Sequence, residues 1–564
     1  MSSTARLLQS KHFTTLSTHG LNNAEKIRLA YLRAREIARH FGFTTSDIKN
    51  LTQKFWDFHR NDICALDLAA FSLLTIQYNL MGGTLLRYID DRPEHQPLLE
   101  KVFNFDVSAQ FMLTELGHGL DAKSLETTAT YLPGEGFDLH TPHLQAAKYM
   151  PPTSPIEGFP RVGLVFAKLI VKGEEHGVRP FIVWLNDGIN MTPGISCRVL
   201  PTRAASKPLD HSITIFNHVR LPSSAILGSL DKAENERKSF LQVISRLEIG
   251  AMAISTTFIP VMKRCVYTAG KYSMRREIRD HQGRARPIFY FRTQHEPVCH
   301  ALSQLLVFEA WVPDNIRRFM DPMVESGVRL AMPALTKALL TKTTQTSLWI
   351  FAERCGAQGL YECNDIIESQ NESRGLSISE GDALMLSIRL AIDLLLDRYR
   401  MPPAEYPESL LAKHESSLLQ DLQDQLQKLG NDHRSNDFNA TILPRCLPLV
   451  EAIGHRMAYE SGKKAGVVTE VLSLFEIGAV LQDPAWYVEN CGLSRAQQLD
   501  MESRAVGALV PMVDGMLDSL GVEPFCRAPI LSDGGMESFV GLLETFDQRG
   551  LVRDSQATPL KHKL

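Results

Sequence analysis

Apolar and polar residues follow different periods in successive parts of the chain. In residues 1–105 apolar residues recur at helical spacing, first among Lys and Arg in 24–41 and then more continuously in 66–89. Because residues three and four apart lie on one face of a helix, this part is predicted to be a helical domain. Gln77, Asn79 and two glycines interrupt the second segment, so we predict a buried helix there and no membrane span.

The pattern changes in residues 106–230, which are rich in Thr, Val, Ile, Gly and Pro. Residues 162–171 and 180–184 are short apolar runs, and residues 211–219 alternate between apolar and polar side chains. Turn-forming clusters such as Asn186-Asp-Gly188 separate these runs. We therefore predict a β-domain, a small barrel or sandwich, inserted between helical parts.

Helical spacing returns after residue 235 and continues toward the C-terminus. Residues 235–400 are predicted to form a helical bundle, and the pair Pro402-Pro403 marks its boundary. Residues 404–564 are predicted to form a second helical domain, which begins with a charged, amphipathic helix at 410–429. The strongest helical segments of the bundle are 240–273, 328–354 and 381–399.

The composition agrees with several globular domains. A chain of 564 residues is too long for one hydrophobic core and suits three or four domains of ~100–200 residues. Its net charge of −4, with both signs interspersed, gives no indication of a nucleic-acid or anionic-membrane partner. Nine cysteines are spread singly, which argues against a disulfide framework and a structural zinc site and favours a reducing, intracellular compartment.

The C-terminal residues His562-Lys563-Leu564 have two interpretations. They resemble the Ser-Lys-Leu peroxisomal address, with His562 in place of the usual small residue. The other interpretation is a solvated basic tail. We expect a peroxisomal protein if the first interpretation holds, and otherwise a cytoplasmic one.

Candidate chemistry begins with the motif Met112-Leu-Thr-Glu-Leu-Gly-His-Gly119. Thr114 offers a hydroxyl, and Gly117 and Gly119 let backbone N–H groups approach a planar polar ligand. By itself the motif also fits a glycine-containing turn that joins a helix to a strand.

Two motifs in the predicted bundle offer contacts for a pyrophosphate. Tyr272-Ser-Met-Arg-Arg276 places an arginine near the end of a long helix, with Arg292-Thr-Gln294 downstream. A guanidinium there can bind a pyrophosphate through two donors, although a solvated helix end has the same local sequence. Arg354-Cys-Gly-Ala-Gln-Gly359 places Gly356 and Gly359 after another helix, where Gly356 also fits a helix C-cap.

The fourth motif is Ser379-Glu-Gly-Asp-Ala-Leu-Met-Leu386. Its local sequence predicts a capping box for the helix 381–399. Ser377 precedes Glu380 by three residues, and Ser379 precedes Asp382 by three residues. The other interpretation is that Glu380 is a catalytic base. The local sequence alone favours the capping box, and catalysis is favoured only by the resemblance described next.

The four motifs, and the order helical, β, helical, helical, resemble the acyl-CoA oxidase and acyl-CoA dehydrogenase superfamily, most closely its peroxisomal-type oxidases. The resemblance is specific over residues 60–400 and looser elsewhere. It implies an α+β multidomain, acyl-CoA dehydrogenase-like fold with an N-terminal helical domain, a middle β-barrel or sandwich, a helical bundle and an extra C-terminal helical domain. It also implies FAD as the cofactor, an acyl-CoA or related acyl thioester as the substrate, and a homodimer.

The resemblance implies roles for the motif residues. Thr114 would bond the flavin ring, while Arg276 and Gln294 would reach the FAD of the neighbouring subunit. Glu380 would be the catalytic base. The other residues expected to bind the cofactor are Gly117, Gly119, Thr153, Gly356, Gly359 and Asp382.

The chain departs from the family's motifs at several positions. The family's Trp-Trp-Pro-Gly-Gly is Tyr149-Met-Pro-Pro-Thr153 here, so Pro152 stands where a glycine donates a backbone N–H near the flavin. Proline has no N–H, so either Thr153 takes over this contact or the reactivity of the flavin is altered. Glu277-Ile-Arg279 replaces a Gln-Phe-Gly sequence after the arginines, and Ala357-Gln358 replaces a Gly-His pair.

These roles predict an FAD-dependent acyl-CoA oxidase that forms a trans-2-enoyl thioester. Glu380 would remove the weakly acidic α-proton, which requires a positioned carboxylate in a dry site. The length of the chain and its C-terminal tripeptide favour O2 as the electron acceptor, H2O2 as a product and a role in fatty-acid β-oxidation. Two alternatives stay open: a specialised dehydrogenase or desaturase of a biosynthetic pathway that acts on a CoA- or carrier-bound acyl group with another acceptor, and a non-catalytic homologue.

Overall fold

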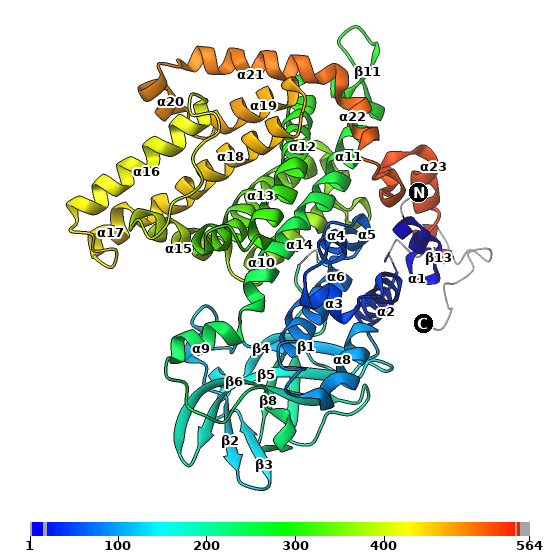
Figure 1. The fold of residues 1–564 in the computed structure, drawn as a ribbon. Helices are drawn as coiled ribbons and strands as arrows, with labels where there is room; N and C mark the ends of the chain where they lie inside the picture. Colours follow the sequence, from blue (N-terminus) through cyan, green and yellow to red (C-terminus); the bar gives the residue numbers. More distant parts are fainter. Residues whose placement is uncertain (1–2, 15–17, 19, 205, 548–549, 553–564) are drawn as a thin grey trace. The chain divides into compact units, whose positions relative to one another are not determined.

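The computed structural model describes residues 3–14, 18, 20–204, 206–547 and 550–552. The C-terminal tripeptide His562-Lys563-Leu564 lies outside these residues. The chain divides into two units, Met1–Gly250 and Ala251–Leu564, each of which is described by itself (Figure 1).

Helices fill the first part of the N-terminal unit. The longest is α2 (Asn23–Phe41), which begins with a capping box between Asn22 and Glu25 and ends at Gly42 in the left-handed conformation. The other helices are η1 (Ser3–Gln9), α1 (Lys11–Thr14), α3 (Thr45–Lys49), α4 (Gln53–His59), α5 (Asp62–Leu66), α6 (Leu68–Thr75), η2 (Ile76–Gly82), α7 (Gly83–Leu85), η3 (Pro93–His95) and α8 (Gln96–Phe103).

The segment 66–89, predicted to be buried helix, is buried but changes its helical type at its centre. The helix η2 is a π-helix, and Gln77 within it is buried. Its side-chain amide donates to the carbonyls of Val102 and Val107, and its amide oxygen accepts the N–H of Ala109 at 2.7 Å. The polar interruption in the sequence pattern is therefore a hydrogen-bonded connection between the helices and β1.

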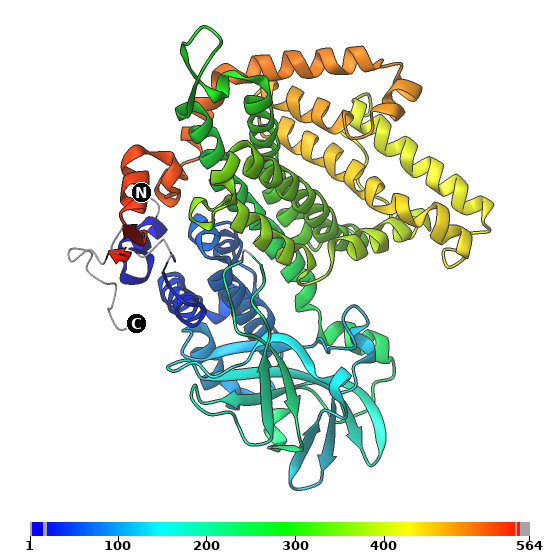
Figure 2. The same ribbon diagram turned by 180° about the vertical axis from the view of Figure 1, so that it is seen from behind.

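Strands of the N-terminal unit form two sheets, seen from behind in Figure 2. The larger sheet has the order β1-β5-β2-β3-β9, with β6 paired to β5, and the smaller has the order β4-β8-β7. Strand β5 pairs in parallel with β1 and β2 and antiparallel with β6. The strands are β1 (Ser108–Met112), β2 (Thr128–Leu132), β3 (Gly136–His140), β4 (Lys148–Pro152), β5 (Arg161–Val171), β6 (Glu174–Asn186), β7 (Ile195–Val199), β8 (His211–Phe216) and β9 (Val219–Leu221).

The two sheets share one apolar core. Buried side chains of the larger sheet, such as Val165 and Phe181, form one cluster with Phe216 from the smaller sheet. The long hairpin β5–β6 turns at Lys172-Gly173, where φ is 52° and 84°. Two-residue turns of this type need positive φ at both positions, which glycine adopts without strain. The predicted fold class, helical parts around a β-barrel or sandwich, is confirmed.

The predicted helical segment 240–273 is interrupted. Helices α9 (Glu236–Val243), α10 (Arg246–Thr256) and α11 (Phe258–Arg275) replace the continuous helix. At the second interruption the hydroxyls of Ser255 and Thr256 donate to backbone carbonyls one turn earlier. Pro260 follows and has no N–H to continue the helical ladder. Hydroxyl and proline chemistry therefore overrides the apolar periodicity.

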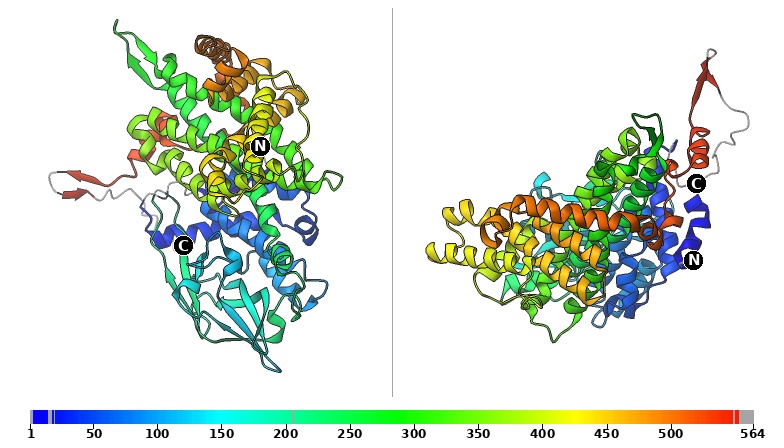
Figure 3. Two further views of the ribbon diagram at one scale, coloured as in Figure 1. Left: turned by 90° about the vertical axis from the view of Figure 1, so that its left-hand side faces the viewer. Right: turned by 90° about the horizontal axis from the view of Figure 1, so that it is seen from above.

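The C-terminal unit is built from long helices packed side by side (Figure 3). Helices α11, α12 (Arg292–Met320) and α13 (Ser326–Arg354) contact one another, and α18 and α19 pack against α12. The remaining elements are β10 (Glu277–Arg279), β11 (Ala285–Pro287), η7 (Ile288–Tyr290), η8 (Gly356–Leu360), η9 (Glu362–Asn364), α14 (Ile366–Ile378), α15 (Ala383–Leu395), α16 (Leu410–Lys428), α17 (Asn436–Thr441), α18 (Cys446–Lys464), α19 (Thr469–Val480), α20 (Pro484–Cys491), α21 (Arg495–Leu509), α22 (Val513–Ser519), α23 (Asp533–Val540), β12 (Thr545–Asp547) and β13 (Gly550–Val552).

One stretch, Glu236–Arg275, has the length and hydropathy of a membrane span. Most of its apolar window is buried inside the protein, as it also is in core helices of globular proteins. The nine cysteines are all free thiols.

A network of buried charges connects the linker after residue 400 to helices α16 and α18. Arg456 of α18 contacts Glu415 of α16 at 2.5 Å and Glu460 at 2.9 Å, and it donates to the carbonyl of Pro402 at 3.2 Å. The Glu460 carboxylate also accepts the N–H of Glu405 at 2.8 Å. Burial alone would lower the pKa of Arg456, but the carboxylates of Glu415 and Glu460 outweigh burial and raise it.

We predict that Arg456→Met lowers the free energy of unfolding by ~3–5 kcal/mol, because two buried carboxylates lose their counter-charge. The matched control is Arg400→Met, which breaks the exposed pair with Asp397 and should cost less than ~1 kcal/mol. Denaturant unfolding of the two variants measures the difference, and equal losses would contradict the prediction.

Candidate functional site

Thr114 lies just beyond the end of β1, in a loop that runs beside β4. Its side chain is half-buried, and its carbonyl accepts the backbone N–H of Tyr149 at 3.0 Å. The structure therefore brings the first sequence motif next to residues 149–153, the segment in which the chain departs from the family pattern.

A fully buried ion pair fixes the Thr114 loop. Lys148 Nζ lies 2.9 Å from Glu115 Oε1 and donates to the carbonyls of Leu113 and Phe166. The Glu115 carboxylate also accepts the backbone N–H groups of residues 126 and 127. Burial lowers the pKa of Lys148 to about 8, against the opposing charge of Glu115. Sequence reasoning missed this pair because its members are 33 residues apart and form no local pattern.

The two glycines of the first motif have different surroundings. Gly117 donates its N–H to the carbonyl of Gln145 at 2.8 Å, and a Cβ at this position would lie 3.0 Å from Gln145 Cβ. A Cβ at Gly119 would meet nothing within 4 Å. Packing of the loop therefore accounts for Gly117, whereas Gly119 presents an open, exposed backbone.

Thr153 points its side chain into the protein. The residue is buried, and its hydroxyl lies 2.7 Å from the hydroxyl of Thr214. Asn186 donates to the Thr153 carbonyl at 2.9 Å. Any part that Thr153 plays in binding a ligand therefore falls to its backbone.

A buried charge network holds the turn after β4. Arg161 donates to the carbonyls of Pro152 and Ser154, at 3.0 and 2.6 Å, and pairs with Asp210 at 2.9 Å. Tyr31 donates to the same carboxylate, and burial raises the pKa of its hydroxyl. Each charged group has partners, so residues 152–154 are held in one geometry.

In the C-terminal unit, the predicted pyrophosphate motifs meet at the ends of three helices. Arg276 caps the end of α11, and its carbonyl accepts the N–H of residue 288 in the turn before α12. Gln294 lies in the first turn of α12. Arg354, at the end of α13, donates at 2.9 Å to the carbonyl of the residue before Gln294. The Gly356 turn follows directly, so the segments that contain Arg276, Gln294 and Gly356 form one cluster.

Gly356 and Gly359 are required by the backbone. Gly356 follows α13 with a φ of 60°, the left-handed conformation that ends many helices. Gly359 is buried, and a Cβ there would lie 2.0 Å from the carbonyl oxygen of Ala352. A larger residue at 359 would have to displace the backbone.

This cluster has polar groups that fit a bound dinucleotide. Arg276 is exposed, and its guanidinium makes no hydrogen bond or ion pair within the part of the chain that the structure describes. Arg275, by contrast, pairs with Asp533 and donates to the carbonyl of Ile530. Gln294 Oε1 is buried without a hydrogen-bond partner among the described residues, which is costly unless a ligand supplies a donor. An exposed guanidinium and an orphaned amide oxygen on neighbouring elements suit a pyrophosphate that carries hydroxyl-bearing groups.

Glu380 lies in a tight turn between α14 and α15. Its φ is 53°, and that of Gly381 is 99°, so two successive residues have positive φ. Asp382 is the N-cap of α15, because its Oδ1 accepts the N–H groups of Leu384 and Met385 at 3.0 and 3.1 Å. The helix therefore starts at Ala383, two residues later than predicted.

The capping-box interpretation of Glu380 is wrong. The hydroxyls of Ser377 and Ser379 donate to carbonyls of α14, at 2.7 and 2.8 Å, and not to the start of α15. The cap belongs to the Asp382 carboxylate, so Glu380 has no part in starting the helix. The catalytic role of Glu380 stays a prediction.

Exposed apolar side chains flank the Glu380 turn. Ile378 is 66% exposed, Leu384 is 49% exposed and Met385 is 44% exposed. An apolar rim around a carboxylate suits a substrate with an acyl chain, which would exclude water from the carboxylate when bound.

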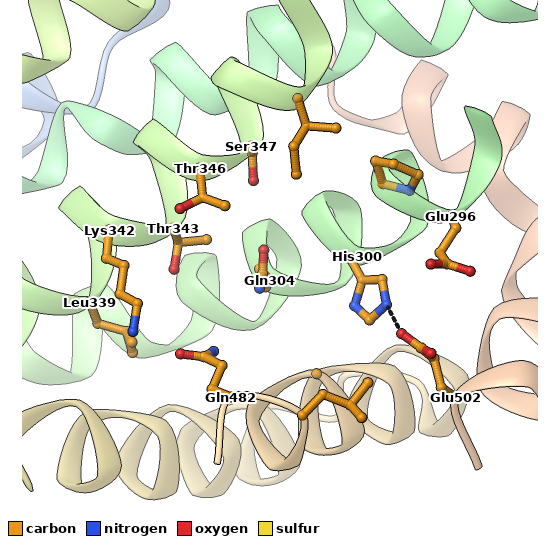
Figure 4. Close-up of a pocket in the computed structure, with 14 residues that line it drawn as sticks. Glu296, His300, Gln304, Leu339, Lys342, Thr343, Thr346, Ser347, Gln482 and Glu502 are labelled. Atoms are coloured by element: carbon orange, nitrogen blue, oxygen red, sulfur yellow. Dashed lines mark hydrogen bonds and ion pairs between the residues drawn. The ribbon is translucent and has the colours of Figure 1, made fainter. Parts of the chain in front are cut away.

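A cavity of about 340 Å³ lies elsewhere in the C-terminal unit (Figure 4). His300 and Gln304 of α12 face Lys342 and Thr343 of α13 across it, and His300 lies 3.0 Å from Glu502. None of the predicted site residues lines this cavity. The sequence motifs therefore do not converge here.

No family model matches the chain. Among characterised proteins it is similar to peroxisomal acyl-coenzyme A oxidase 3 of Homo sapiens, with 26% identity over 347 residues that cover 56% of this chain and 48% of that protein. It is also similar to peroxisomal acyl-coenzyme A oxidase 1 of Arabidopsis thaliana, with 27% identity over 49% of this chain and 45% of that protein. The matched region spans about half the length of these relatives.

Solved structures match nearly the whole chain. The structure of acyl-CoA oxidase 1 from Yarrowia lipolytica superimposes with a TM-score of 0.81 and 17% identity, covering 96% of this chain and 88% of that one. That of acyl-CoA oxidase-2 from Caenorhabditis elegans, bound with FAD, ascaroside-CoA and ATP, gives a TM-score of 0.72 and 16% identity, covering 94% and 93%. The chain has the fold of these enzymes.

We predict that Gly359→Ala lowers the free energy of unfolding by ~1–3 kcal/mol, because the new Cβ overlaps the Ala352 carbonyl. The control is Gly507→Ala on an exposed face of α21, where a Cβ meets nothing within 4 Å. That change should be neutral or stabilising by up to ~1 kcal/mol. Thermal unfolding compares the two, and a neutral Gly359→Ala would contradict the close packing described.

Proposed function

We propose that this chain, which by its fold and sequence similarity belongs to the acyl-CoA oxidase and acyl-CoA dehydrogenase superfamily, is an FAD-dependent acyl-CoA oxidase. It would convert an acyl-CoA and O2 into the trans-2-enoyl-CoA and H2O2. The observation that carries the proposal is the Glu380 turn: a glutamate at positive φ directly before the helix cap, with exposed apolar residues close to it in the chain.

Glu380 would act as the general base. The α-proton of a thioester is weakly acidic, so its removal needs a carboxylate held in place and kept from water by the bound acyl chain. Ile378, Leu384 and Met385 are suited to that exclusion of water.

In a homodimer, residues of two subunits would hold each cofactor. Thr114 and the open backbone at Gly119 would face the flavin ring. Arg276, Gln294 and the Gly356 turn would hold the pyrophosphate of the FAD that is bound to the neighbouring subunit. When bound, FAD supplies the acceptor for the β-hydrogen as hydride. The orphaned oxygen of Gln294 and the exposed Arg276 support this assignment. Asp382 would contribute through the turn that it caps.

The extra helices after residue 400 favour an oxidase over a dehydrogenase. They form α16–α23, and the match to a solved acyl-CoA oxidase extends over 96% of the chain. The purified protein should show a flavin absorption spectrum and release H2O2 when an acyl-CoA is added in air. Flavin reduction with slow reoxidation by O2 would favour the dehydrogenase or desaturase alternative, and a protein without flavin would favour a non-catalytic homologue.

We predict that Glu380→Gln leaves folding and flavin content intact but slows flavin reduction by at least ~10²-fold, because the amide cannot accept the α-proton. Anaerobic single-turnover mixing with an acyl-CoA measures the rate. Glu325→Gln, at an exposed glutamate before α13, is the control and should reduce its flavin normally. Near-normal reduction in Glu380→Gln would mean that the base lies elsewhere.

The proposed subcellular location is the peroxisome, because the similar proteins of Homo sapiens and Arabidopsis thaliana are named as peroxisomal enzymes. We predict that His562-Lys563-Leu564 is the address. A fluorescent fusion should be punctate with the tripeptide and diffuse without it. An unchanged distribution would assign targeting to another signal.

A further inference from the structure

A lysine in the middle of α13 reaches the Glu380 turn. Lys337 is completely buried, and its ammonium group donates to two backbone carbonyls, those of Ser379 and Gly381. These carbonyls belong to the residues directly before and directly after Glu380. The sequence shows Lys337 as the one charged residue in the otherwise uncharged stretch 330–341.

Burial of this amine needs an explanation beyond helix stability. Burial lowers the pKa of Lys337 to about 8, while the carboxylates of Glu380 and Asp382 oppose the shift. A buried ammonium is unfavourable unless it is well paired, and an apolar residue would suit a core helix better. Among the described residues, both hydrogen bonds of the Lys337 ammonium go to the turn between α14 and α15, so we assign the amine to that turn.

The turn itself requires such support. Glu380 has a side chain and a φ of 53°, a conformation that L-residues avoid. The Asp382 cap fixes the start of α15 but not the peptide units around Glu380. The Lys337 ammonium holds the peptide unit that precedes Glu380, through the Ser379 carbonyl, and the peptide unit that follows Gly381, through the Gly381 carbonyl.

We propose that Lys337 is a positioning residue for the reaction, which holds the carbonyls of the residues on both sides of Glu380 and so positions the Glu380 carboxylate toward the substrate. This inference rests on the proposed function, in which Glu380 is the base. Lys337 touches neither substrate nor cofactor in this role and acts only through Glu380.

The test is Lys337→Met in the full-length, flavin-loaded protein. The concentration dependence of anaerobic flavin reduction separates the limiting rate constant from the Kd of the acyl-CoA. We expect the limiting rate constant to fall at least ~10-fold, because the Glu380 carboxylate is no longer held in position. Flavin content and the Kd of the acyl-CoA should change less than ~2-fold. Lys342→Met, on the same helix in a half-exposed pair with Glu451, is the control and should keep both values.

A double variant decides whether Lys337 acts through Glu380. In the Glu380→Gln background, Lys337→Met should slow the residual reduction by less than ~2-fold, because the group that it positions is already gone. Lys337→Arg, which keeps a cation with several donors, should recover part of the rate. If Lys337→Met does not fold, Lys337→Gln, which keeps one donor group, takes its place in both backgrounds.

Two results would overturn the inference: a normal rate constant in Lys337→Met, or an equally large fall in both backgrounds. Failure of the proposed function looks different. In that case the unaltered protein would hold no flavin or would not reduce it with any acyl-CoA, and Glu380→Gln would have no effect.

Discussion

A residue with a side chain keeps a positive φ only where its surroundings hold it there. At Glu380 the hold is a buried ammonium group, that of Lys337, which donates to the carbonyls on both sides. The Asp382 cap then starts α15 directly after the turn. The backbone of the turn is therefore fixed from two directions, and the exposed apolar residues Ile378, Leu384 and Met385 lie close to Glu380 in the chain. The proposed chemistry depends on that arrangement.

The N-terminal unit uses the same physical device. Lys148 is also buried, has its pKa lowered to about 8, and donates to the carbonyls of Leu113 and Phe166. Leu113 directly precedes Thr114, as Ser379 directly precedes Glu380. In each unit a lysine that can satisfy several acceptors holds an irregular segment that no helical or sheet ladder could hold. The ammonium suits this task because its three donors can reach carbonyls that point in different directions.

The sequence predicts what is periodic and misses what joins distant segments. The fold class follows from helical and strand periods, and α2 and α16 match the predicted segments within a residue or two. The periods could not show the interruption of 240–273, which comes from hydroxyls and a proline within the apolar pattern. They also could not show Lys337 beside Ser379, because contact across 42 residues is set by the packing of helices. The assigned roles of Thr114, Arg276, Gln294 and Glu380 stay predictions, although the structure gathers each motif into a coherent local geometry.

The replacement of a glycine by Pro152 has a physical consequence that the structure makes specific. Two successive prolines remove two N–H groups from β4, and the register against β8 shifts between Tyr149 and Pro152. Arg161 compensates by donating to the Pro152 carbonyl, so the strand end is held by a side chain in place of a ladder. The Thr153 hydroxyl is bonded to Thr214 and cannot substitute for the lost donor. This edge is therefore well positioned but poorer in donors. Any change in flavin reactivity caused by Pro152 would come from a missing hydrogen bond and not from a displaced strand.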